Sequence, residues 1–241
     1  QKKWIGNAAE GGTLVTFGRD SRSGKISSFL VDADTPGYKA EIIAHKLGMP
    51  TAPTCLVTYE NCEIPARNLL GDEGHGLKVA YSALMGGRLG VAAGSVGIIV
   101  DCLHECLNYA RTREQFGKPI GRHQLVQRHI GRMAVKAEAA RALVKTAAER
   151  KAEYDLDRSN LELRREADLL IAQAKYYAVN AAQEAAHDAV QVFGANGFLF
   201  TNRPARHYAD ARACQIYEGT NEILEQKIAV GYLGPEFEAF A

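Results

Sequence analysis

The placement of proline divides this chain into two parts that must fold differently. Residues 1–70 contain four of the seven prolines, whereas residues 76–118 and 120–203 contain none. Proline removes a backbone donor and clashes with the preceding helical turn, so long helices can extend only through the proline-free segments. The sequence therefore predicts a first part without long helices and a second part dominated by them.

The first part carries the signals of β-strands and turns. β-branched and aromatic residues concentrate at Thr13–Phe17, Ile26–Asp32 and Cys55–Tyr59, and a turn around Gly24 separates the first two segments. These short segments predict a small β-barrel or sandwich domain over residues 1–73, incomplete at its start.

The second part carries helical periodicity, which begins near Gly76. This periodicity predicts three long helices and one short one, at Leu77–Thr112, Arg122–Tyr154, Leu161–Val192 and Glu222–Val230. Short connections and alanine-rich faces are typical of up-and-down bundles whose helices approach closely. We therefore expect an α+β protein in which residues 74–241 form an up-and-down four-helix bundle domain.

Composition and charge exclude some classes of partner. With 29 Lys+Arg against 28 Asp+Glu the net charge is about +1, and no basic stretch is interleaved with aromatic residues as a nucleic-acid groove requires. The longest apolar run, Val91–Val100, is interrupted by glycine and is too short to span a bilayer. We expect neither a nucleic-acid partner nor a membrane span.

The five cysteines give no sign of a disulfide framework or a metal centre. Their number is odd and no CxxC pair occurs, so reduced thiols are the simplest interpretation. Cys102 and Cys106 lie four residues apart on a predicted helix and could supply two ligands, but no clustered His or Cys completes a set. We expect no metal site.

The most informative motif is CQIYEGTNEI at residues 214–223. Glu218 stands between an aromatic residue and a Gly-Thr pair, directly before a predicted helix that Thr220 or Asn221 would cap. A carboxylate on such a loop is a candidate general base, and the N–H groups beside it could donate to an incoming oxygen. An exposed loop glutamate without any role is the alternative, and spacing alone does not separate the two.

Two further segments combine turns with groups suited to anion binding. RTREQFGKPI at 111–120 sets Arg111 and Arg113 beside Phe116 at a helix end, where the cations can bind an anion or simply complement the helix dipole. AVQVFGANGF at 189–198 has glycines at a helix stop, where bare backbone can approach a pyrophosphate or merely turn. From the residues alone, both alternatives stay open in each segment.

In their order along the chain, these segments resemble the acyl-CoA dehydrogenase family. QIYEGT, RTREQFGKPI and QVFGANG recur in that family together with WIGNA at residues 4–8 and GGRLGVAAG at residues 86–94. Any one motif could arise by chance, but all of them in register hardly could. The resemblance covers nearly the whole chain. It implies the family's middle β-domain and C-terminal helical domain, with the N-terminal helical domain absent, so the chain is expected to be a fragment.

The resemblance implies an FAD-dependent α,β-dehydrogenation of an acyl-CoA thioester. Glu218 matches the family's catalytic base, which takes the α proton while the β hydrogen leaves as hydride to flavin N5. Arg88, Tyr217 and Gly219 match positions at the substrate. Gly87 stands where some branches of the family carry the catalytic glutamate instead, which favours Glu218 as the base in this chain.

The same matching implies a set of FAD contacts. The residues that match them are Trp4, Arg113, Gln115, Phe116, His123, Gln124, Gln191, Gly194, Ala195, Thr220 and Glu222. In the family, contacts to the pyrophosphate and adenosine cross a subunit interface, whereas Thr220 and Glu222 belong on the flavin's own side. A homo-oligomer, either a dimer or a dimer of dimers, is therefore implied.

The resemblance also implies an acyl-CoA substrate and an electron-transfer flavoprotein or other acceptor. It places the protein in the cytoplasm if the source is bacterial, and otherwise in the mitochondrial matrix or peroxisome. Gly6 departs from the family's usual pattern, because it deletes a hydroxyl that often hydrogen-bonds flavin N5. Two alternatives stay open: an acyl-CoA oxidase that uses oxygen, and a non-catalytic scaffold on the same fold.

Overall fold

The computed structural model describes residues 1–237, which separate into two compact units. One unit comprises residues 1–84 and the other begins at Met85. The helix α1 (Gly76–Thr112) begins close to the boundary expected after residue 73, and its first turns belong to the β-rich unit.

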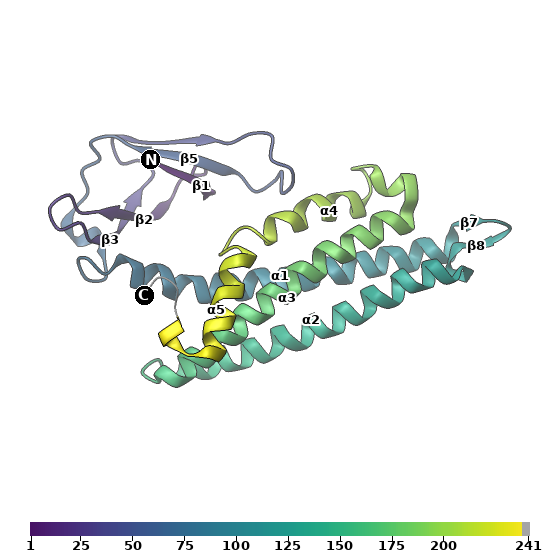
Figure 1. Cartoon of the computed structure of the whole chain (residues 1–241). Helices are drawn as coiled ribbons and strands as arrows, with labels where there is room; N and C mark the ends of the chain where they lie inside the picture. Colours follow the sequence, from purple (N-terminus) through teal and green to yellow (C-terminus); the bar gives the residue numbers. More distant parts are fainter. Residues whose placement is uncertain (238–241) are drawn as a thin grey trace. The chain divides into compact units, whose positions relative to one another are not determined.

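Six strands form two antiparallel three-stranded sheets in the β-rich unit (Figure 1). One sheet has the order β1-β5-β4 and the other has the order β2-β3-β6. The strands are β1 (Lys2–Gly6), β2 (Thr13–Arg19), β3 (Ile26–Asp32), β4 (Tyr38–Ile42), β5 (Thr54–Tyr59) and β6 (Leu69–Leu70). Ala8 joins two fully buried residues of β5, Cys55 and Val57, in a small core.

The sequence predicts β2, β3 and β5 but not β1, β4 or the two-residue β6. β1 and β4 are the edges of one sheet and carry exposed lysine or glutamate side chains, so their apolar alternation is weak. Each pairs with β5, as Tyr38 does with Tyr59 and Ile42 with Cys55, and only Trp4 of β1 is left out of the pairing. Tertiary pairing, rather than local preference, makes these segments strands.

Five α-helices occur in the described part of the chain: α1, α2 (Gln124–Leu156), α3 (Leu161–Phe193), α4 (Arg203–Cys214) and α5 (Asn221–Leu233). A small hairpin, β7 (Glu114–Gln115) and β8 (Lys118–Pro119), joins α1 to α2. Buried side chains of α1, α2 and α3 share one core, and α4 returns along α3 (Figure 1). The expected α+β class with a helical bundle is confirmed.

Local signals determine where α3 and α4 begin. The Asn160 side chain accepts hydrogen bonds from the N–H groups of Glu162 and Leu163, both at 3.1 Å, and so caps α3, which begins at the predicted Leu161. The sequence predicts no helix at α4, because Pro204 is typical of a helix break. Pro204 instead lies in the first turn of α4, where its missing N–H costs no hydrogen bond.

Small side chains build the core of the bundle. Of the fourteen buried residues of α3, nine are alanine, so the neighbouring helices can approach α3 closely. Larger side chains, among them Ile99, Met133 and Ile171, are fully buried between the helices. Two of the buried residues of α3 carry charge, Lys175 and Asp188, and buried charges require partners.

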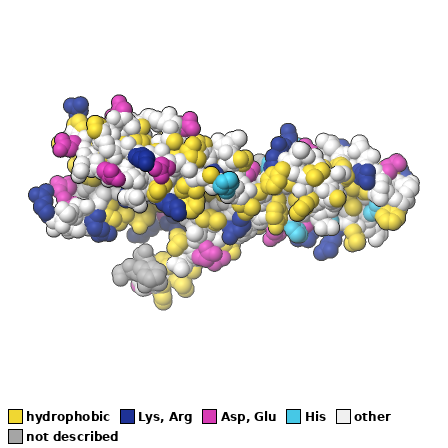
Figure 2. All heavy atoms as spheres, turned by 90° about the horizontal axis from the view of Figure 1, so that it is seen from above, with side chains coloured by type: hydrophobic (Ala, Val, Ile, Leu, Met, Phe, Trp, Pro, Cys, Tyr) yellow, Lys and Arg dark blue, Asp and Glu magenta, His cyan; other side chains and the backbone are white. Residues whose placement is uncertain are grey.

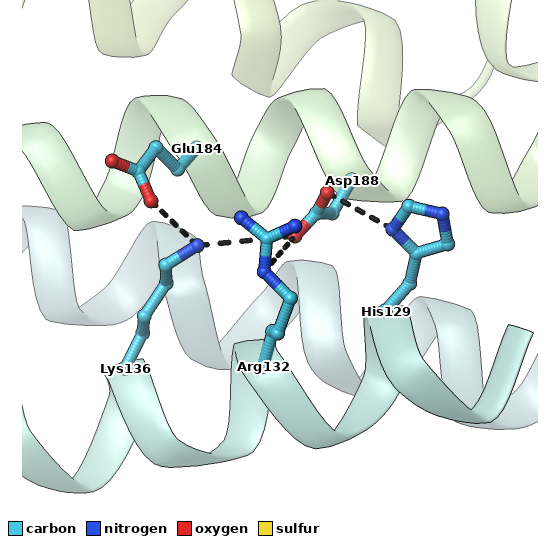
Figure 3. A network of polar contacts seen from close by, with 5 residues as sticks. All are labelled: His129, Arg132, Lys136, Glu184 and Asp188. Atoms are coloured by element: carbon cyan, nitrogen blue, oxygen red, sulfur yellow. Dashed lines mark hydrogen bonds and ion pairs between the residues drawn. The ribbon is translucent and has the colours of Figure 1, made fainter. Parts of the chain in front are cut away.

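Asp188 finds its partners on α2 (Figure 3). His129 Nδ1 lies 3.0 Å from Asp188 Oδ1, and the nitrogens of Arg132 and Lys136 both lie 3.8 Å from Oδ2. Lys136 also pairs with Glu184, at 2.7 Å. This polar network joins α2 to α3 around a buried carboxylate.

Polar and apolar groups are mixed on the surface. On the face drawn in Figure 2, lysine and arginine side chains are interspersed with aspartate and glutamate. By length and composition alone α1 is apolar enough to cross a membrane, a test that the core helix of a soluble protein also passes. Since Ile99, Cys102 and Cys106 of α1 are fully buried in the bundle core, this is weak evidence for a span.

Candidate active site

The motif at residues 214–223 forms a tight loop between α4 and α5. Ile216 and Tyr217 donate to the carbonyl of Ala213, at 2.9 and 3.1 Å, and so add a turn to the end of α4. The chain then reverses at Glu218 and Gly219, whose φ angles are +57° and +92°. Glycine adopts a positive φ readily, but the Cβ of a glutamate makes it costly. The conformation of Glu218 is therefore imposed by its surroundings.

Two buried cations hold the carbonyls of this loop. Arg88 on α1 donates from Nε to the Glu218 carbonyl at 3.0 Å, and Lys175 on α3 donates from Nζ to the Gly219 carbonyl at 2.8 Å. Arg88 is 7% exposed and Lys175 is 0% exposed. Asp168 on α3 lies 3.8 Å from Arg88 Nη1 and balances part of this positive charge.

Asn180 on α3 fixes the two ends of the loop. Its Oδ1 accepts from Gln215 Nε2 at 2.7 Å and from Asn221 Nδ2 at 2.8 Å. The backbone N–H of Asn221 also donates to the Gln215 carbonyl, at 3.2 Å. The loop is therefore held at its ends and at its centre by residues of two rigid helices.

The carboxylate of Glu218 lies against α1 at Gly87. A Cβ atom built on Gly87 would lie 2.3 Å from Glu218 Oε2 and 2.7 Å from its Cδ. The position from which a side chain at residue 87 would start is thus occupied by the Glu218 carboxylate. Glycine at residue 87 and glutamate at residue 218 are therefore matched to each other in space, 131 residues apart in the chain.

The loop also presents unused backbone donors. Among the hydrogen bonds of residues 1–237, none is donated by the backbone N–H of Glu218 or of Gly219. Because the C=O and N–H of a trans peptide point in opposite directions, the Gly219 N–H faces away from Arg88. The adjacent residues Glu218 and Gly219 thus present one carboxylate and two free backbone N–H groups.

Tyr217 and Glu222, which precede and follow Glu218 in the chain, differ in charge. Tyr217 is 38% exposed, and its hydroxyl lies 3.5 Å from Cys214 Sγ. Burial raises the pKa of Tyr217 and the hydrogen bond with Cys214 raises it further, so the phenol stays neutral. Thr220 is the N-cap residue of α5, and Glu222 lies in its first turn. Hydrogen bonds from its own backbone N–H and from Thr220 lower the pKa of Glu222 and keep it ionised.

Five of the expected cofactor residues gather where α1 ends and α2 begins. The β7–β8 hairpin holds Phe116 with φ +54° and its side chain 92% exposed. The Phe116 ring meets His123 edge to face, with centroids 5.9 Å apart, and His123 Nε2 lies 3.3 Å from the Gln115 carbonyl. Arg113 is exposed and forms no ion pair within residues 1–237, and Gln124 is the first residue of α2.

The end of α3 carries three more expected cofactor residues, all of them exposed: Gln191, Gly194 and Ala195. This segment contacts the same end of α1. Asn196 Nδ2 donates to the Tyr109 hydroxyl at 2.9 Å, and Tyr109 stacks on Phe193 with ring centroids 4.1 Å apart. The chain thus brings these eight residues, from three segments, to one end of the helical unit.

This end is far from Glu218 within one chain. Arg88, which contacts the Glu218 carbonyl, lies near the start of α1, whereas Tyr109 lies near its end. At a rise of about 1.5 Å per residue, the two are about 30 Å apart. The structure therefore does not bring Thr220 and Glu222 together with Phe116 and Gly194 in one chain.

Trp4, the remaining expected FAD contact, belongs to β1 in the β-rich unit. The pairing of β1 with β5 is irregular between Lys3 and Ile5, and Trp4 there has φ +68° and is 63% exposed. Lys3 Nζ lies 5.0 Å from the centroid of the Trp4 ring. Such a bulge redirects a side chain out of the sheet, and here it exposes the only tryptophan of the chain.

No group of three or more His, Cys, Asp or Glu side chains in the part of the chain that the structure describes could hold a metal ion. Cys102 and Cys106 are fully buried on α1. Burial raises the pKa of Cys106 to about 12, and it also raises the pKa of Cys102. Both groups are therefore thiols, which do not ligate metals as thiolates do.

The sequence alone does not identify Lys175 or Asn180 as residues of this site. Lys175 lies on the same buried face of α3 as Ile171 and Ala178. A lysine at a position that periodicity assigns to a buried face needs an acceptor, and this is the signal that could have found it. The acceptor itself, a carbonyl 44 residues away, is visible only in the structure.

Comparisons with known proteins indicate the same family as these motifs. The family profile described as "Acyl-CoA dehydrogenase, C-terminal domain" matches residues 74–233. An acyl-CoA dehydrogenase from Bacillus subtilis (strain 168) is 38% identical over 236 residues, covering 97% of this chain and 60% of that protein. The mitochondrial short-chain specific acyl-CoA dehydrogenase of Homo sapiens is 38% identical over 232 residues, covering 95% of this chain and 54% of that protein.

Solved structures show the same relationship. The structure of butyryl-CoA dehydrogenase from Megasphaera elsdenii matches this chain with a TM-score of 0.89 at 34% sequence identity, covering 97% of this chain and 59% of that one. The chain belongs to the acyl-CoA dehydrogenase family, as its motifs predict. It spans 54% to 60% of the length of these three relatives.

Proposed function

We propose that the protein to which this chain belongs removes hydrogen from the α and β carbons of an acyl-CoA thioester, with FAD as its cofactor. The observation that carries this proposal is the Glu218 carboxylate, held against Gly87 beside two free N–H groups of its own loop. Membership in the acyl-CoA dehydrogenase family supports the choice of substrate and cofactor.

Glu218 is the proposed general base. The α hydrogen of a thioester is a weak acid, so its removal requires both a positioned base and donors that stabilise the negative charge on the thioester oxygen. Glu218 would take the α proton, and its own backbone N–H would donate to the thioester oxygen. When bound, FAD would supply the acceptor for the β hydride, leaving an α,β-unsaturated thioester.

Three neighbours are proposed to shape the substrate site. Tyr217, partly exposed and neutral, would form a wall of the acyl channel, and Gly219 would leave room for the thioester. A Cβ atom on Gly219 would lie 3.3 Å from Arg88 Nη2, so this glycine also lets Arg88 pack directly beneath the loop. Arg88 would act at the substrate through the Glu218 carbonyl that it holds.

The chemistry of the exposed residues at the far end of α1 fits the FAD pyrophosphate and adenosine. An unpaired Arg113, the exposed ring of Phe116 and the bare backbone at Gly194 suit an anion, a planar base and close approach by phosphate. The other residues proposed to hold this part of FAD are Gln115, His123, Gln124, Gln191 and Ala195. Thr220, Glu222 and Trp4 would contact the flavin part.

A homo-oligomer follows from this proposal. The residues proposed for the two parts of FAD are separated by about 30 Å along α1, so one chain does not gather them into a single site. Each FAD would therefore be held by two copies of the chain, in a dimer or a dimer of dimers. The exposed Phe116, which has no apolar cover in one copy, would then be covered by the cofactor and the second copy.

The electron acceptor is proposed to be an electron-transfer flavoprotein or a similar acceptor, in the bacterial cytoplasm, the mitochondrial matrix or the peroxisome. Gly6 favours an acyl-CoA oxidase as the second candidate. A Cβ atom on Gly6 would meet nothing within 4 Å, so packing does not require glycine there, and the missing hydroxyl is free to alter how the reduced cofactor reacts with oxygen. Anaerobic reduction by substrate followed by mixing with air separates the two, because slow reoxidation excludes the oxidase.

The complete protein tests this proposal with a series of acyl-CoA substrates of increasing length and an artificial electron acceptor. Glu218→Gln should keep FAD bound and lose roughly 10²- to 10⁴-fold in kcat, the usual contribution of a general base. The matched control is Glu149→Gln, which changes an exposed glutamate on α2 and should keep full activity. Full activity of Glu218→Gln would remove the assignment of the base.

A further inference from the structure

We propose that Lys175 is a positioning residue for this reaction: its side-chain nitrogen holds the Gly219 carbonyl and thereby keeps Glu218 in the conformation that presents its carboxylate. This inference rests on the proposed function. It assigns a role to a residue that lies beneath the loop and would contact neither substrate nor FAD.

Lys175 is buried, and its side chain is used for a single hydrogen bond among the described residues. It is 0% exposed, and Nζ makes one hydrogen bond within the described residues, to the Gly219 carbonyl at 2.8 Å. The titratable groups that act on it are Cys214, Arg88, Glu218 and Glu222, and burial, the largest effect, lowers its pKa to about 8. Burying this group is costly, and an apolar side chain could fill the same space without that cost. The hydrogen bond is therefore the feature that distinguishes lysine at this position.

The contact acts on the peptide that follows Gly219. Arg88 holds the peptide between Glu218 and Gly219, and Lys175 holds the next one, between Gly219 and Thr220. Since Gly219 has no Cβ, its own conformation does not restrain the second peptide. Without Lys175, this peptide can rotate and Glu218 can leave its costly φ of +57°.

The position of the carboxylate depends on that backbone conformation. Glu218 reaches Gly87 from a left-handed backbone, and a change of φ would swing its side chain away from α1. The other anchors do not hold the peptide between Gly219 and Thr220, because Arg88 holds the peptide before Gly219 and Asn180 holds Gln215 and Asn221 at the ends of the loop. Lys175 is therefore expected to affect proton removal by Glu218 rather than substrate binding.

Lys175→Met in the complete FAD-containing protein tests this role, since methionine keeps much of the volume and removes the donor. We would measure kcat, KM and the exchange of the acyl-CoA α hydrogen with solvent deuterium, the last under anaerobic conditions without an electron acceptor. Exchange reports proton removal alone. The matched control is Lys136→Met, because Lys136 is also a mostly buried cation but pairs with Glu184 on α3 and not with the loop.

We expect Lys175→Met to lose roughly 100-fold in both kcat and the exchange rate, the effect of a displacement of about 1 Å at a reacting group, with KM nearly unchanged. Lys175→Arg, which keeps a cationic donor, should recover part of the exchange rate. Lys136→Met should lower the melting temperature without slowing exchange in the folded protein.

A Lys175→Met protein that melts earlier but exchanges the α hydrogen at the wild-type rate would reduce Lys175 to a structural residue and overturn the inference. If that variant does not fold, the same exchange rate is measured for Lys175→Gln. Glutamine keeps a neutral donor on a side chain that is one bond shorter. Failure of the proposed function has a different signature, because the wild-type protein itself would then show neither turnover nor exchange.

Discussion

Gly87→Ala should separate the stability of the helical unit from the position of the Glu218 carboxylate. Residue 87 lies inside α1, where alanine is more favourable than glycine by about 1 kcal/mol. The new Cβ would lie 2.3 Å from Glu218 Oε2, well inside the 3.0 Å that real Cβ contacts essentially never cross. Because the obstructing atoms are the flexible end of a glutamate, the carboxylate rather than a helix is expected to move, by about 1 Å.

A displacement of that size costs roughly 100-fold in rate, or about 2.7 kcal/mol of activation free energy. The variant should therefore unfold at a higher denaturant concentration while its kcat falls about 100-fold, measured on the complete protein with an acyl-CoA and an artificial acceptor. Gly97→Ala is the matched control: it lies on the same helix, its Cβ would meet nothing within 4 Å, and it should gain stability without losing activity. An unchanged kcat in Gly87→Ala would show that the carboxylate does not lie against α1 during turnover.

Three further predictions concern a buried carboxylate, two buried thiols and a buried lysine. Asp188→Asn removes the buried carboxylate that faces the cations of α2, and it should lower the free energy of unfolding by roughly 3 kcal/mol in a denaturant titration. Cys102 and Cys106 should resist alkylation at pH 8 until the protein is unfolded, as mass spectrometry would detect, because burial raises the pKa of Cys106 to about 12. Burial lowers the pKa of Lys175 from 10.5 to about 8, so between these pH values the unfolded chain binds more protons than the folded one. We therefore compare the unfolding free energy of the wild type with that of Lys175→Met. The wild-type value minus the variant value should rise by roughly 3 kcal/mol from pH 8 to pH 10.5. A fall in this difference would contradict the burial penalty.

The long helices could be predicted because their signals are local. For α3 the predicted range, Leu161–Val192, differs from the observed one by a single residue, since an Asn160 cap and a glycine at its end fix both limits. The same local reasoning missed α4, because proline is tolerated in a first helical turn that the sequence pattern did not distinguish from a break. The strands β1 and β4 were missed because their exposed polar side chains leave little apolar alternation, and pairing with β5 makes them strands.

The residues of the candidate site also differ in whether the sequence alone identifies them. Glu218 could be named from the sequence because its neighbours, Gly219 and Thr220, form a recognisable turn before a helix, and the family's motif coincides with it. Lys175 could not be assigned a role, because its position in an alanine-rich stripe predicts burial without predicting what it would bind.

By itself, the sequence determined the division into a β-rich part and a helical part, the three long helices and the family, and it predicted the candidate base, because these depend on patterns and motifs that are local in the chain. Only the tertiary structure decided where that base points. The Glu218 backbone is held in a left-handed conformation by Arg88 and Lys175, and its carboxylate occupies the space that Gly87 leaves free. Those contacts join segments separated by 44 to 131 residues, and packing, which acts through space rather than along the chain, is what brings them together.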